Sequence, residues 1–315
     1  MSTTAPRAYT ARVAERFTVV QGGSRADKFL AERLPGRGRR AVADAFEAGQ
    51  VRINGRRAKK GQMLTAGDVV ELDGVVASAG GVPPTPEPDA PLALVHVDAR
   101  LVVVNKAGGP ATHPLDPGEL GTVANAVVAR WPECASASEA PREGGAAHRL
   151  DAGTTGVLVF ARDRDAWRWL RAAFHEGRVE KEYLALVVGE VTRAGEIDLP
   201  IAQRGARAVV TLDDPAALPA TTRFRPERRF RGYTLLRCAA ETGRMHQVRA
   251  HLAYLETPIV GDATYGSSEG TPRLTGHFLH AARLSLPHPD GGRAVTYEAP
   301  LPADRAAVLA ALPPI

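Results

Sequence analysis

The sequence has few cysteines and no long apolar run, and both scarcities narrow the class of protein. Its 315 residues include two cysteines, Cys134 and Cys238, which lie 104 positions apart (238 − 134). They form no CxxC motif, so neither a disulfide framework nor a structural zinc site is predicted. No stretch approaches the roughly 18 uncharged apolar residues of a membrane span, and the N-terminus MSTTAPRAYTARVAERF has no apolar signal-peptide core. We expect a cytoplasmic protein with no membrane segment.

Charge of both signs is present, but its distribution along the chain is uneven. Residues 1–78 carry 14 Lys/Arg and 8 Asp/Glu, a net charge of +6, whereas the remaining 26 (40 − 14) basic and 27 (35 − 8) acidic residues give −1. Such a density of basic side chains is typical of proteins that contact RNA phosphates, although a generally basic surface is the plain alternative. The basic side chains concerned are Lys28, Arg37, Arg39, Arg40, Arg52, Arg56, Arg57, Lys59 and Lys60.

The basic segment has the pattern of a small α+β domain. Ser24 and Asp27 have the spacing of a capping box that opens a helix. A second helix is predicted over 39–48, with Gly49 ending it. The Asn54-Gly55 pair in QVRINGRR is a strong hairpin signal. In this order, SRADKFLAERLP followed by AVADAFEAGQVRINGRRAKKGQMLTAGDVVEL resembles the RNA-binding domain named after ribosomal protein S-four. The expected RNA contacts of this domain, 1–78, include Lys28, Arg39, Arg40 and Arg52.

A Pro/Gly-rich segment separates this domain from the rest of the chain. Residues 79–91, AGGVPPTPEPDAP, are unsuited to a helix or a central strand and predict a semi-stiff linker. From 92 to 315, short Val/Leu/Ile runs alternate with turns, and three segments have helical periodicity. These helices are expected at 121–131, 163–175 (with Asp163 as its cap and Gly177 at its end) and 245–255. The pattern predicts an α+β domain with a mostly antiparallel mixed sheet.

The segment HRLDAGTTG carries the first candidate chemistry. Asp151 lies in a Gly/Thr-rich turn where backbone can approach a substrate closely, so its carboxylate is a candidate nucleophile or base. Arg149 has a planar guanidinium that would be able to enter a nucleic-acid helix in place of a flipped base, or to pair with phosphate. A solvated loop carboxylate and a surface arginine are the ordinary alternatives.

Two further segments contain candidate partners. In VEKEYLALVVGE, Lys181 and Tyr183 share one face of a predicted strand, and Tyr183 is suited to stacking on an extruded base or to lying half in the core. In ETGRMHQVRAHLAYL, Arg244 stands beside a helix start, with His246 and Arg249 on one side of the helix. Arg244 is a candidate partner for a buried carboxylate, with a phosphate contact or an ordinary surface position as the alternative.

The loop NKAGGPATHP, 105–114, contains Lys106 and His113. It lacks the strand–GxxxxGKS–helix arrangement of a nucleotide-binding loop, so that function is excluded. An irregular loop that lines a site or a subunit edge is the remaining interpretation.

Taken together, these segments resemble the RluA type of pseudouridine synthase, which acts on ribosomal or transfer RNA. The resemblance runs through HRLDAGTTG, KEYLALV, GRMHQVRAH, GDATYG and LHAARLSLPHP, in that order. It implies that Asp151 is the catalytic carboxylate, Tyr183 lies against the target base, Arg244 is the salt-bridge partner of Asp151, and Arg149 inserts into the RNA helix. His148 and Lys181 join the expected RNA contacts. The implied isomerisation needs no cofactor, no metal and no obligate protein partner.

The sequence departs from the usual pattern at three places, and two other functions remain as alternatives. Ala107 follows Lys106 where Pro is usual, Thr155 stands where Ser is common, and Met245 stands where Thr is common. A non-catalytic RNA-binding or ribosome-assembly factor would use the basic domain with an inert second domain. A base-releasing glycosidase would need a second carboxylic acid, and none accompanies Asp151 in its motif.

Overall fold

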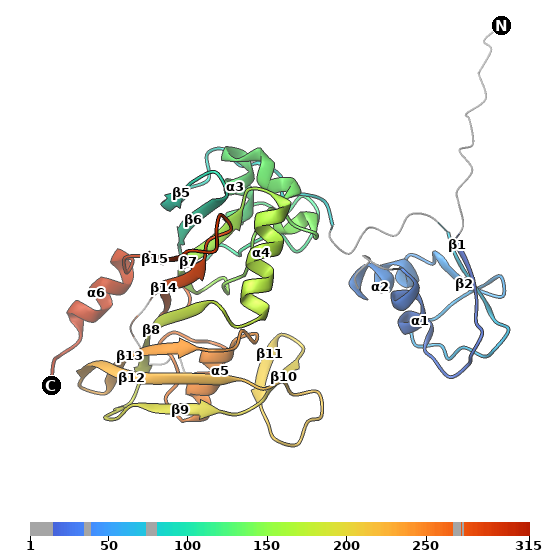
Figure 1. Ribbon diagram of the computed structural model, residues 1–315. Helices are drawn as coiled ribbons and strands as arrows, with labels where there is room; N and C mark the ends of the chain where they lie inside the picture. Colours follow the sequence, from blue (N-terminus) through green and yellow to red (C-terminus); the bar gives the residue numbers. More distant parts are fainter. Residues whose placement is uncertain (1–14, 35–38, 74–80, 267–271, 273) are drawn as a thin grey trace, which may run out of the picture. The chain divides into compact units, whose positions relative to one another are not determined.

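The chain folds into two units, Met1–Gly81 and Val82–Ile315, in a computed structural model. The structure describes residues 15–34, 39–73, 81–266, 272 and 274–315, with the side chains of 39–41 excepted (Figure 1).

The first unit is a four-stranded antiparallel sheet with two short helices. Its strands pair in the order β1-β4-β2-β3. Val51, Val70 and Leu72 of the sheet pack with Leu30 and Phe46 of the helices in one apolar core. The elements are β1 (Glu15–Thr18), α1 (Ala26–Arg33), α2 (Arg39–Glu47), β2 (Val51–Ile53), β3 (Arg56–Arg57) and β4 (Val69–Leu72).

The predicted hairpin is confirmed, and the predicted capping box is wrong. Asn54 and Gly55 have φ values of 52° and 76°, as a two-residue turn between β2 and β3 requires. Helix α1 begins at Ala26 behind Arg25, which makes no side-chain cap. Asp27 instead accepts two hydrogen bonds from Arg25, at 3.0 and 2.9 Å, so its carboxylate does not serve as the reciprocal cap.

The second unit is built on one large mixed sheet, which confirms the predicted α+β class. The strands run in the order β5-β6-β7-β14-β8-β13-β12-β9, with β15 paired to β14. The β7–β14 pair is parallel and the other pairs are antiparallel. The strands are β5 (Ala93–Val97), β6 (Leu101–Lys106), β7 (Thr155–Ala161), β8 (Glu180–Val188), β9 (Gly195–Asp198), β12 (Thr221–Phe230), β13 (Tyr233–Ala240), β14 (Leu279–Pro287) and β15 (Ala294–Glu298). A separate hairpin consists of β10 (Ile201–Arg204) and β11 (Arg207–Val210).

The three helices expected in this unit are present, close to their predicted bounds. They are α3 (Val123–Arg130), α4 (Arg164–His175) and α5 (Gln247–Tyr254), and α6 (Ala303–Ala311) follows the sheet. Asp163 accepts hydrogen bonds from the backbone N–H groups of Asp165 and Ala166, at 3.0 and 2.9 Å, which confirms the predicted cap. Gly177 has φ 71° just beyond the C-terminus of α4. Among the described residues, no helix is both long and apolar enough to cross a membrane.

Part of the segment predicted as a linker packs on the second unit. The carbonyl oxygen of Thr85 accepts from Asn125 Nδ2 at 2.7 Å, and that of Ala90 accepts from Arg130 Nη2 at 2.8 Å. Both donors belong to α3. The side chains of α3 thus fix the chain before β5, so the predicted linker of 79–91 extends too far. The proline content of the segment does not prevent this packing, because the accepting carbonyl oxygens belong to Thr85 and Ala90.

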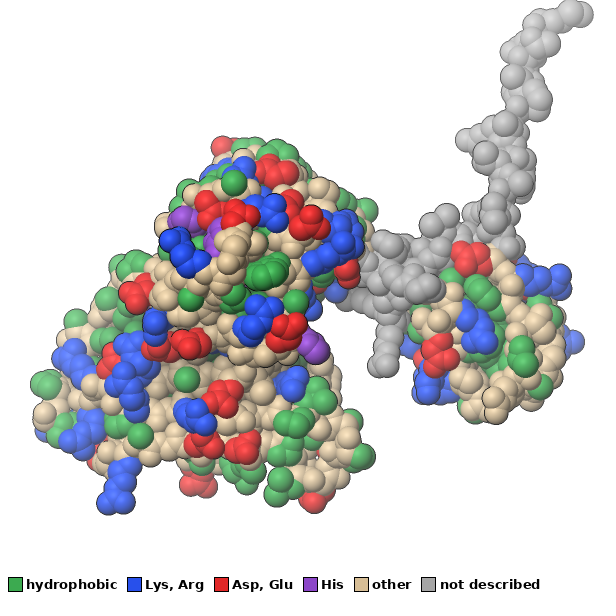
Figure 2. All heavy atoms as spheres, viewed as in Figure 1, with side chains coloured by type: hydrophobic (Ala, Val, Ile, Leu, Met, Phe, Trp, Pro, Cys, Tyr) green, Lys and Arg blue, Asp and Glu red, His purple; other side chains and the backbone are tan. Residues whose placement is uncertain are grey.

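Helices cover both halves of the sheet and bring the candidate segments together (Figure 1). Trp167 and Leu170 of α4 pack with β7, while Val248 and Leu252 of α5 pack with β8 and β13. The loop that carries Asp151 leads directly into β7, and the parallel neighbour β14 lies between β7 and β8. The face of β8, β12 and β13 seen in Figure 2 mixes acidic and basic side chains.

Candidate active site

A pocket of about 440 Å³ lies where the loop before β7 meets the end of β13 and the start of α5. The pocket brings together residues far apart in the sequence, among them the predicted Asp151, Tyr183, Arg149 and Arg244. Its lining residues are Arg149, Leu150, Asp151, Thr154, Tyr183, Ala240, Thr242, Gly243, Arg244, His246, Gln247, Val248, Arg249 and Leu279.

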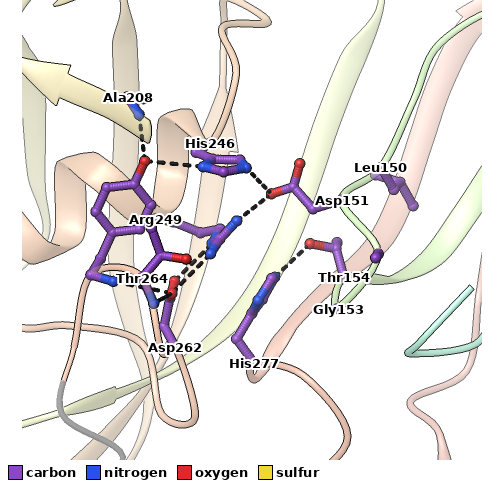
Figure 3. A network of polar contacts seen from close by, with 12 residues as sticks. Leu150, Asp151, Gly153, Thr154, Ala208, His246, Arg249, Asp262, Thr264 and His277 are labelled. Carbon is purple, nitrogen blue, oxygen red and sulfur yellow. Dashed lines mark hydrogen bonds and ion pairs between the residues drawn. The ribbon is translucent and has the colours of Figure 1, made fainter. Parts of the chain in front are cut away.

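Asp151 forms a buried ion pair with Arg249 of α5. Arg249 Nη1 donates to Asp151 Oδ2 at 2.8 Å. The opposite edge of the same guanidinium donates to Asp262, with Nε–Oδ2 2.7 Å and Nη2–Oδ1 2.8 Å (Figure 3). The Arg249 side chain is 6% exposed and that of Asp262 is fully buried, whereas that of Asp151 is 22% exposed. One buried cation therefore joins a buried carboxylate to the carboxylate that faces the pocket.

Hydrogen bonding keeps the Arg249–Asp262 pair ionised. Burial alone would raise the pKa of the Asp262 carboxyl, but the two hydrogen bonds and the charge of Arg249 outweigh it and lower that pKa. Burial likewise opposes the charge on Arg249, yet Asp262 and Asp151 together raise its pKa. A fixed positive charge therefore stands beside Asp151.

The predicted pairing of Arg244 with Asp151 is wrong. Arg244 Nε donates to the carbonyl oxygen of Pro219 at 2.9 Å, and its backbone N–H donates to Gln247 Oε1 at 3.1 Å. Arg244 precedes α5 and lies at the pocket edge, whereas Arg249 lies within the helix on the face toward Asp151. The sequence contained this signal, since His246 and Arg249 share one side of the helix and a buried arginine requires a carboxylate partner.

His246 and Tyr265 form a second polar contact near Asp151. His246 Nε2 lies 3.7 Å from Asp151 Oδ2, and its Nδ1 lies 3.0 Å from the Tyr265 hydroxyl (the first contact appears in Figure 3). That hydroxyl accepts from the Ala208 N–H at 2.6 Å. Sequence reasoning missed Asp262 and Tyr265, although both belong to the quoted GDATYG segment.

Two buried basic side chains hold the backbone that carries Asp151. Lys106 Nζ donates to the carbonyl oxygens of Ala152 and Thr154 at 2.8 and 2.9 Å. Arg305 Nη2 donates to the carbonyl oxygen between them, that of Gly153, at 2.9 Å. Burial lowers the pKa of Lys106 to about 7. From the sequence, the loop of Lys106 is expected to line a site or a subunit edge. The Lys106 side chain instead lies behind the Asp151 loop and holds its backbone.

Histidine and glycine close the other side of this loop. His277 Nε2 lies 2.8 Å from Thr154 Oγ1, and burial lowers the pKa of His277 to about 4. A Cβ on Gly276 would come 2.5 Å from the Cα of Gly153, so the two backbones approach as only glycine permits. His113 is also buried, with Nδ1 3.1 Å from the carbonyl oxygen of Pro114, and it is absent from the pocket lining.

Tyr183 lies beside Asp151 on β8. Its half-buried ring packs against two apolar clusters, and burial raises the pKa of its hydroxyl. No hydrogen bond to that hydroxyl occurs within the part of the chain that the structure describes. The Tyr183 ring forms part of the pocket wall, where a ligand is able to contact it.

The remaining predicted RNA contacts of this unit differ in exposure. Arg149 is exposed at the pocket rim. His148 is turned inward: its Nε2 accepts from the Val159 N–H at 3.1 Å and its ring packs 4.8 Å from that of Phe174. The side chain is half-buried, and its RNA contact stays a prediction. Lys181 Nζ donates to the carbonyl oxygen of Thr242 at 2.8 Å, and burial lowers its pKa to about 8.

The first unit presents some of its predicted RNA contacts at the surface. Lys28 and Arg52 are exposed, and Arg52 Nε lies 3.3 Å from Asp73 Oδ2. Arg39 and Arg40 begin α2, but their side chains lie outside the described residues. Figure 2 shows Lys and Arg side chains at several places around this unit.

The geometry places a carboxylate beside an aromatic ring in one pocket. Asp151 is held by a cation, its backbone is fixed from behind, and arginines stand at the rim. Within the described residues, no group of three His, Cys, Asp or Glu side chains is arranged to hold a metal ion.

Comparison with known proteins assigns both units to families. Residues 100–254 match the RNA pseudouridylate synthase family, and residues 24–70 match the S4 domain. An "uncharacterized RNA pseudouridine synthase" of Chloroflexus aurantiacus is 39% identical over 307 residues, covering 94% of this chain and 93% of that protein. The ribosomal large subunit pseudouridine synthase D of Haemophilus ducreyi is 33% identical, covering 92% of this chain and 91% of the relative.

Solved structures agree with this assignment. The human RNA pseudouridylate synthase domain containing 1 is 25% identical and superposes with a TM-score of 0.57, covering 73% of this chain and 91% of that one. The corresponding domain containing 4 is also 25% identical, with a TM-score of 0.54 and coverage of 69% and 92%. The chain therefore belongs to the RNA pseudouridine synthases of the RluA type and carries an S4 domain before its catalytic unit.

Proposed function

We propose that this protein isomerises specific uridines of large-subunit ribosomal RNA to pseudouridine, with Asp151 as the catalytic carboxylate. The observation that carries the proposal is the Asp151–Arg249 ion pair at 2.8 Å, next to Tyr183 in one pocket. The choice of RNA is supported by relatives named as ribosomal large subunit pseudouridine synthases. Ribosomal and transfer RNA were both expected from the sequence, and these names favour the former.

The reaction suits this set of groups. The N1–C1′ bond breaks and a C5–C1′ bond forms, while C5 gives up its proton and N1 takes one up. The reaction is therefore an isomerisation with no net oxidation or reduction. A target base has to leave its stack to reach a carboxylate inside a pocket. The Asp151 carboxylate is then available as a nucleophile or a base.

The other pocket residues take supporting roles in this proposal. Tyr183 stacks against the extruded base, because its ring faces the pocket and its hydroxyl has no hydrogen-bond partner in the described chain. Arg149 enters the space that the base leaves, since its guanidinium is planar and exposed. Arg244 contacts RNA phosphate at the rim, and Lys181 lies behind it.

The S4 domain supplies affinity for RNA rather than chemistry. Its exposed Lys28 and Arg52 are suited to phosphate contacts, and Arg39 and Arg40 remain predictions of the same kind. The protein acts in the cytoplasm in this proposal, which accords with two free and buried cysteines, Cys134 and Cys238.

The test uses ribosomal RNA that lacks modifications, incubated with the wild-type protein or with Asp151→Asn. Pseudouridine is then mapped at single-nucleotide resolution, and RNA binding is measured in parallel. We expect sites that appear with the wild type alone, while both proteins bind RNA. Wild-type turnover by Asp151→Asn would refute the assignment of Asp151.

The same experiment separates the two alternative functions. RNA bound by both proteins without any pseudouridine would favour the assembly factor. Release of free uracil would favour the glycosidase, although Asp151 is the one carboxylic acid that lines the pocket among the described residues.

A further inference from the structure

The two carboxylate oxygens of Asp151 have different surroundings. Oδ2 accepts from Arg249 Nη1 at 2.8 Å and lies 3.7 Å from His246 Nε2. Oδ1 has no hydrogen-bond partner in the described part of the chain. Figure 3 shows both dashed contacts reaching the same oxygen. The protein therefore engages one oxygen and leaves the other to the pocket.

The hydrogen bonds around Tyr265 determine which ring nitrogen of His246 carries a proton. The Tyr265 oxygen accepts from the Ala208 N–H at 2.6 Å. Its own O–H then needs an acceptor, and His246 Nδ1 at 3.0 Å is the one available among the described residues. A neutral imidazole has one N–H and one acceptor nitrogen. If Nδ1 accepts from Tyr265, the ring proton is on Nε2, the atom that faces Asp151.

The backbone and the surroundings of His246 keep the ring in this place. His246 has φ 54° and ψ 21°, a left-handed conformation that is uncommon for a residue other than glycine. Its ring meets the Tyr265 ring edge to face, with centroids 5.7 Å apart and planes at 88°. An uncommon conformation that its surroundings maintain is a feature of functional sites.

His246 is neutral in these surroundings, which gives its tautomer a consequence. Burial lowers the pKa of His246, and Arg249 and Arg149 lower it further, whereas Asp151 and Asp262 raise it; the balance is a lowered pKa. A neutral ring donates through one nitrogen alone. Whether the N–H of His246 faces Asp151 therefore depends on Tyr265.

We propose that Tyr265 is a positioning residue that holds His246 as the Nε2–H tautomer, and that this N–H becomes a second hydrogen bond to Asp151 Oδ2 when RNA binds. The inference rests on the proposed role of Asp151. At 3.7 Å the contact is longer than a hydrogen bond, and hydrogen bonds at catalytic sites commonly tighten once the substrate is present. With Oδ2 held by Arg249 and His246, Oδ1 is turned to the target nucleotide.

The first test reads the tautomer directly, in the full-length protein. The ring ¹⁵N shifts of His246 are measured by long-range ¹H–¹⁵N NMR and assigned by their loss in His246→Gln. We expect a protonated Nε2 and an unprotonated Nδ1 in the wild type. In Tyr265→Phe, which keeps the ring but removes the hydroxyl, we expect a mixture of tautomers. A protonated Nδ1 in the wild type, or an unchanged pattern in Tyr265→Phe, would overturn the proposal.

The second test reads turnover. Tyr265→Phe is expected to lower kcat about tenfold with little change in KM. This is the size of effect known for residues that orient metal-binding side chains, and Tyr265 orients His246 in a similar way. Tyr254→Phe, at an exposed position of α5, is the matched control and should leave both constants unchanged. His246→Gln retains an N–H near the place of Nε2 and should keep most activity. His246→Asn tolerates the backbone conformation, but its side chain is too short to reach Asp151, so this variant should lower kcat.

These outcomes separate the inference from the function on which it rests. Wild-type turnover by Asp151→Asn would refute the role of Asp151, whatever the tautomer of His246. If Asp151→Asn is inactive but Tyr265→Phe and His246→Asn both keep the wild-type kcat, the assignment of Asp151 holds and the positioning role of Tyr265 is wrong.

Discussion

Arg249 and Asp262 form a buried two-point ion pair, with Nε–Oδ2 2.7 Å and Nη2–Oδ1 2.8 Å. Both donors on one edge of the guanidinium are thereby occupied, and Nη1 is directed at Asp151. Asp262 reaches this place from the segment after α5, and its backbone is fixed by contacts of the same carboxylate with the N–H of Thr264 at 3.0 Å. The carboxylate that never touches the pocket thus orients the cation that does.

We predict that Asp262→Asn lowers kcat about 10–100-fold while RNA affinity stays near the wild-type value. This is the size of effect known for residues that orient metal-binding side chains, and Asp262 orients Arg249 in a similar way. It also lowers the free energy of unfolding, by about 3 kcal/mol, because one partner of a buried pair loses its charge. Steady-state kinetics, RNA binding and urea unfolding measure these effects. Asp290→Asn is the control, since the Asp290 side chain is 63% exposed and lies 3.5 Å from Arg100 Nε, and such surface pairs contribute little.

Arg249→Lys and Arg244→Lys are predicted to have different effects. A lysine is unable to hold Asp262 at two points and Asp151 at a third, so Arg249→Lys should lower kcat about 10–100-fold. Arg244→Lys keeps a positive charge at the rim, so kcat is retained and RNA affinity falls modestly. A loss of kcat in Arg244→Lys equal to that in Arg249→Lys would contradict the structural assignment of the ion pair.

The sequence was sufficient to predict the sheet, the three helices of the catalytic unit and the segments that meet at the pocket. These features follow from local periodicity and from the order of the motifs. Arg244 was paired with the wrong group because the direction of a side chain at a helix start depends on tertiary contacts, here the carbonyl of Pro219. The hydrogen bond from the Val159 N–H to His148 Nε2 was missed for the same reason.

Lys106→Met is predicted to destabilise the catalytic unit and to lower kcat. The carbonyl oxygens of Ala107, Ala152 and Thr154 lose their donor, at a cost of about 1–3 kcal/mol for each group left unpaired. Tryptophan fluorescence during urea unfolding reports on this unit, because all 3 tryptophans of the chain lie beyond residue 130. Lys28→Met, at an exposed position of the first unit, should leave that transition unchanged; an unchanged transition in Lys106→Met would exclude a structural role.

The stability of the catalytic unit is predicted to fall as the pH is lowered from about 6.5 to 4. His277 is held neutral, with a pKa lowered to about 4 by burial and by the charge of Arg249. Between these values the unfolded chain binds a proton that the folded chain does not, so acid favours unfolding. His277→Gln removes this proton, and the slope of unfolding free energy against pH should decrease by about 1.4 kcal/mol per pH unit within that window.

The S4 domain is predicted to set the salt dependence of RNA binding without altering the chemical step. Lys28→Ala combined with Arg52→Ala removes two exposed cations, so the slope of log affinity against log salt should become shallower by up to about 2. The change in kcat at saturating RNA should be small, because neither residue belongs to the unit that contains Asp151. Glu32→Ala, an exposed change of opposite sign on α1, is the control and should not weaken binding. A double variant with an unchanged slope would mean that RNA phosphates are contacted elsewhere, and the pocket rim at Arg149 and Arg244 would then be the next place to substitute.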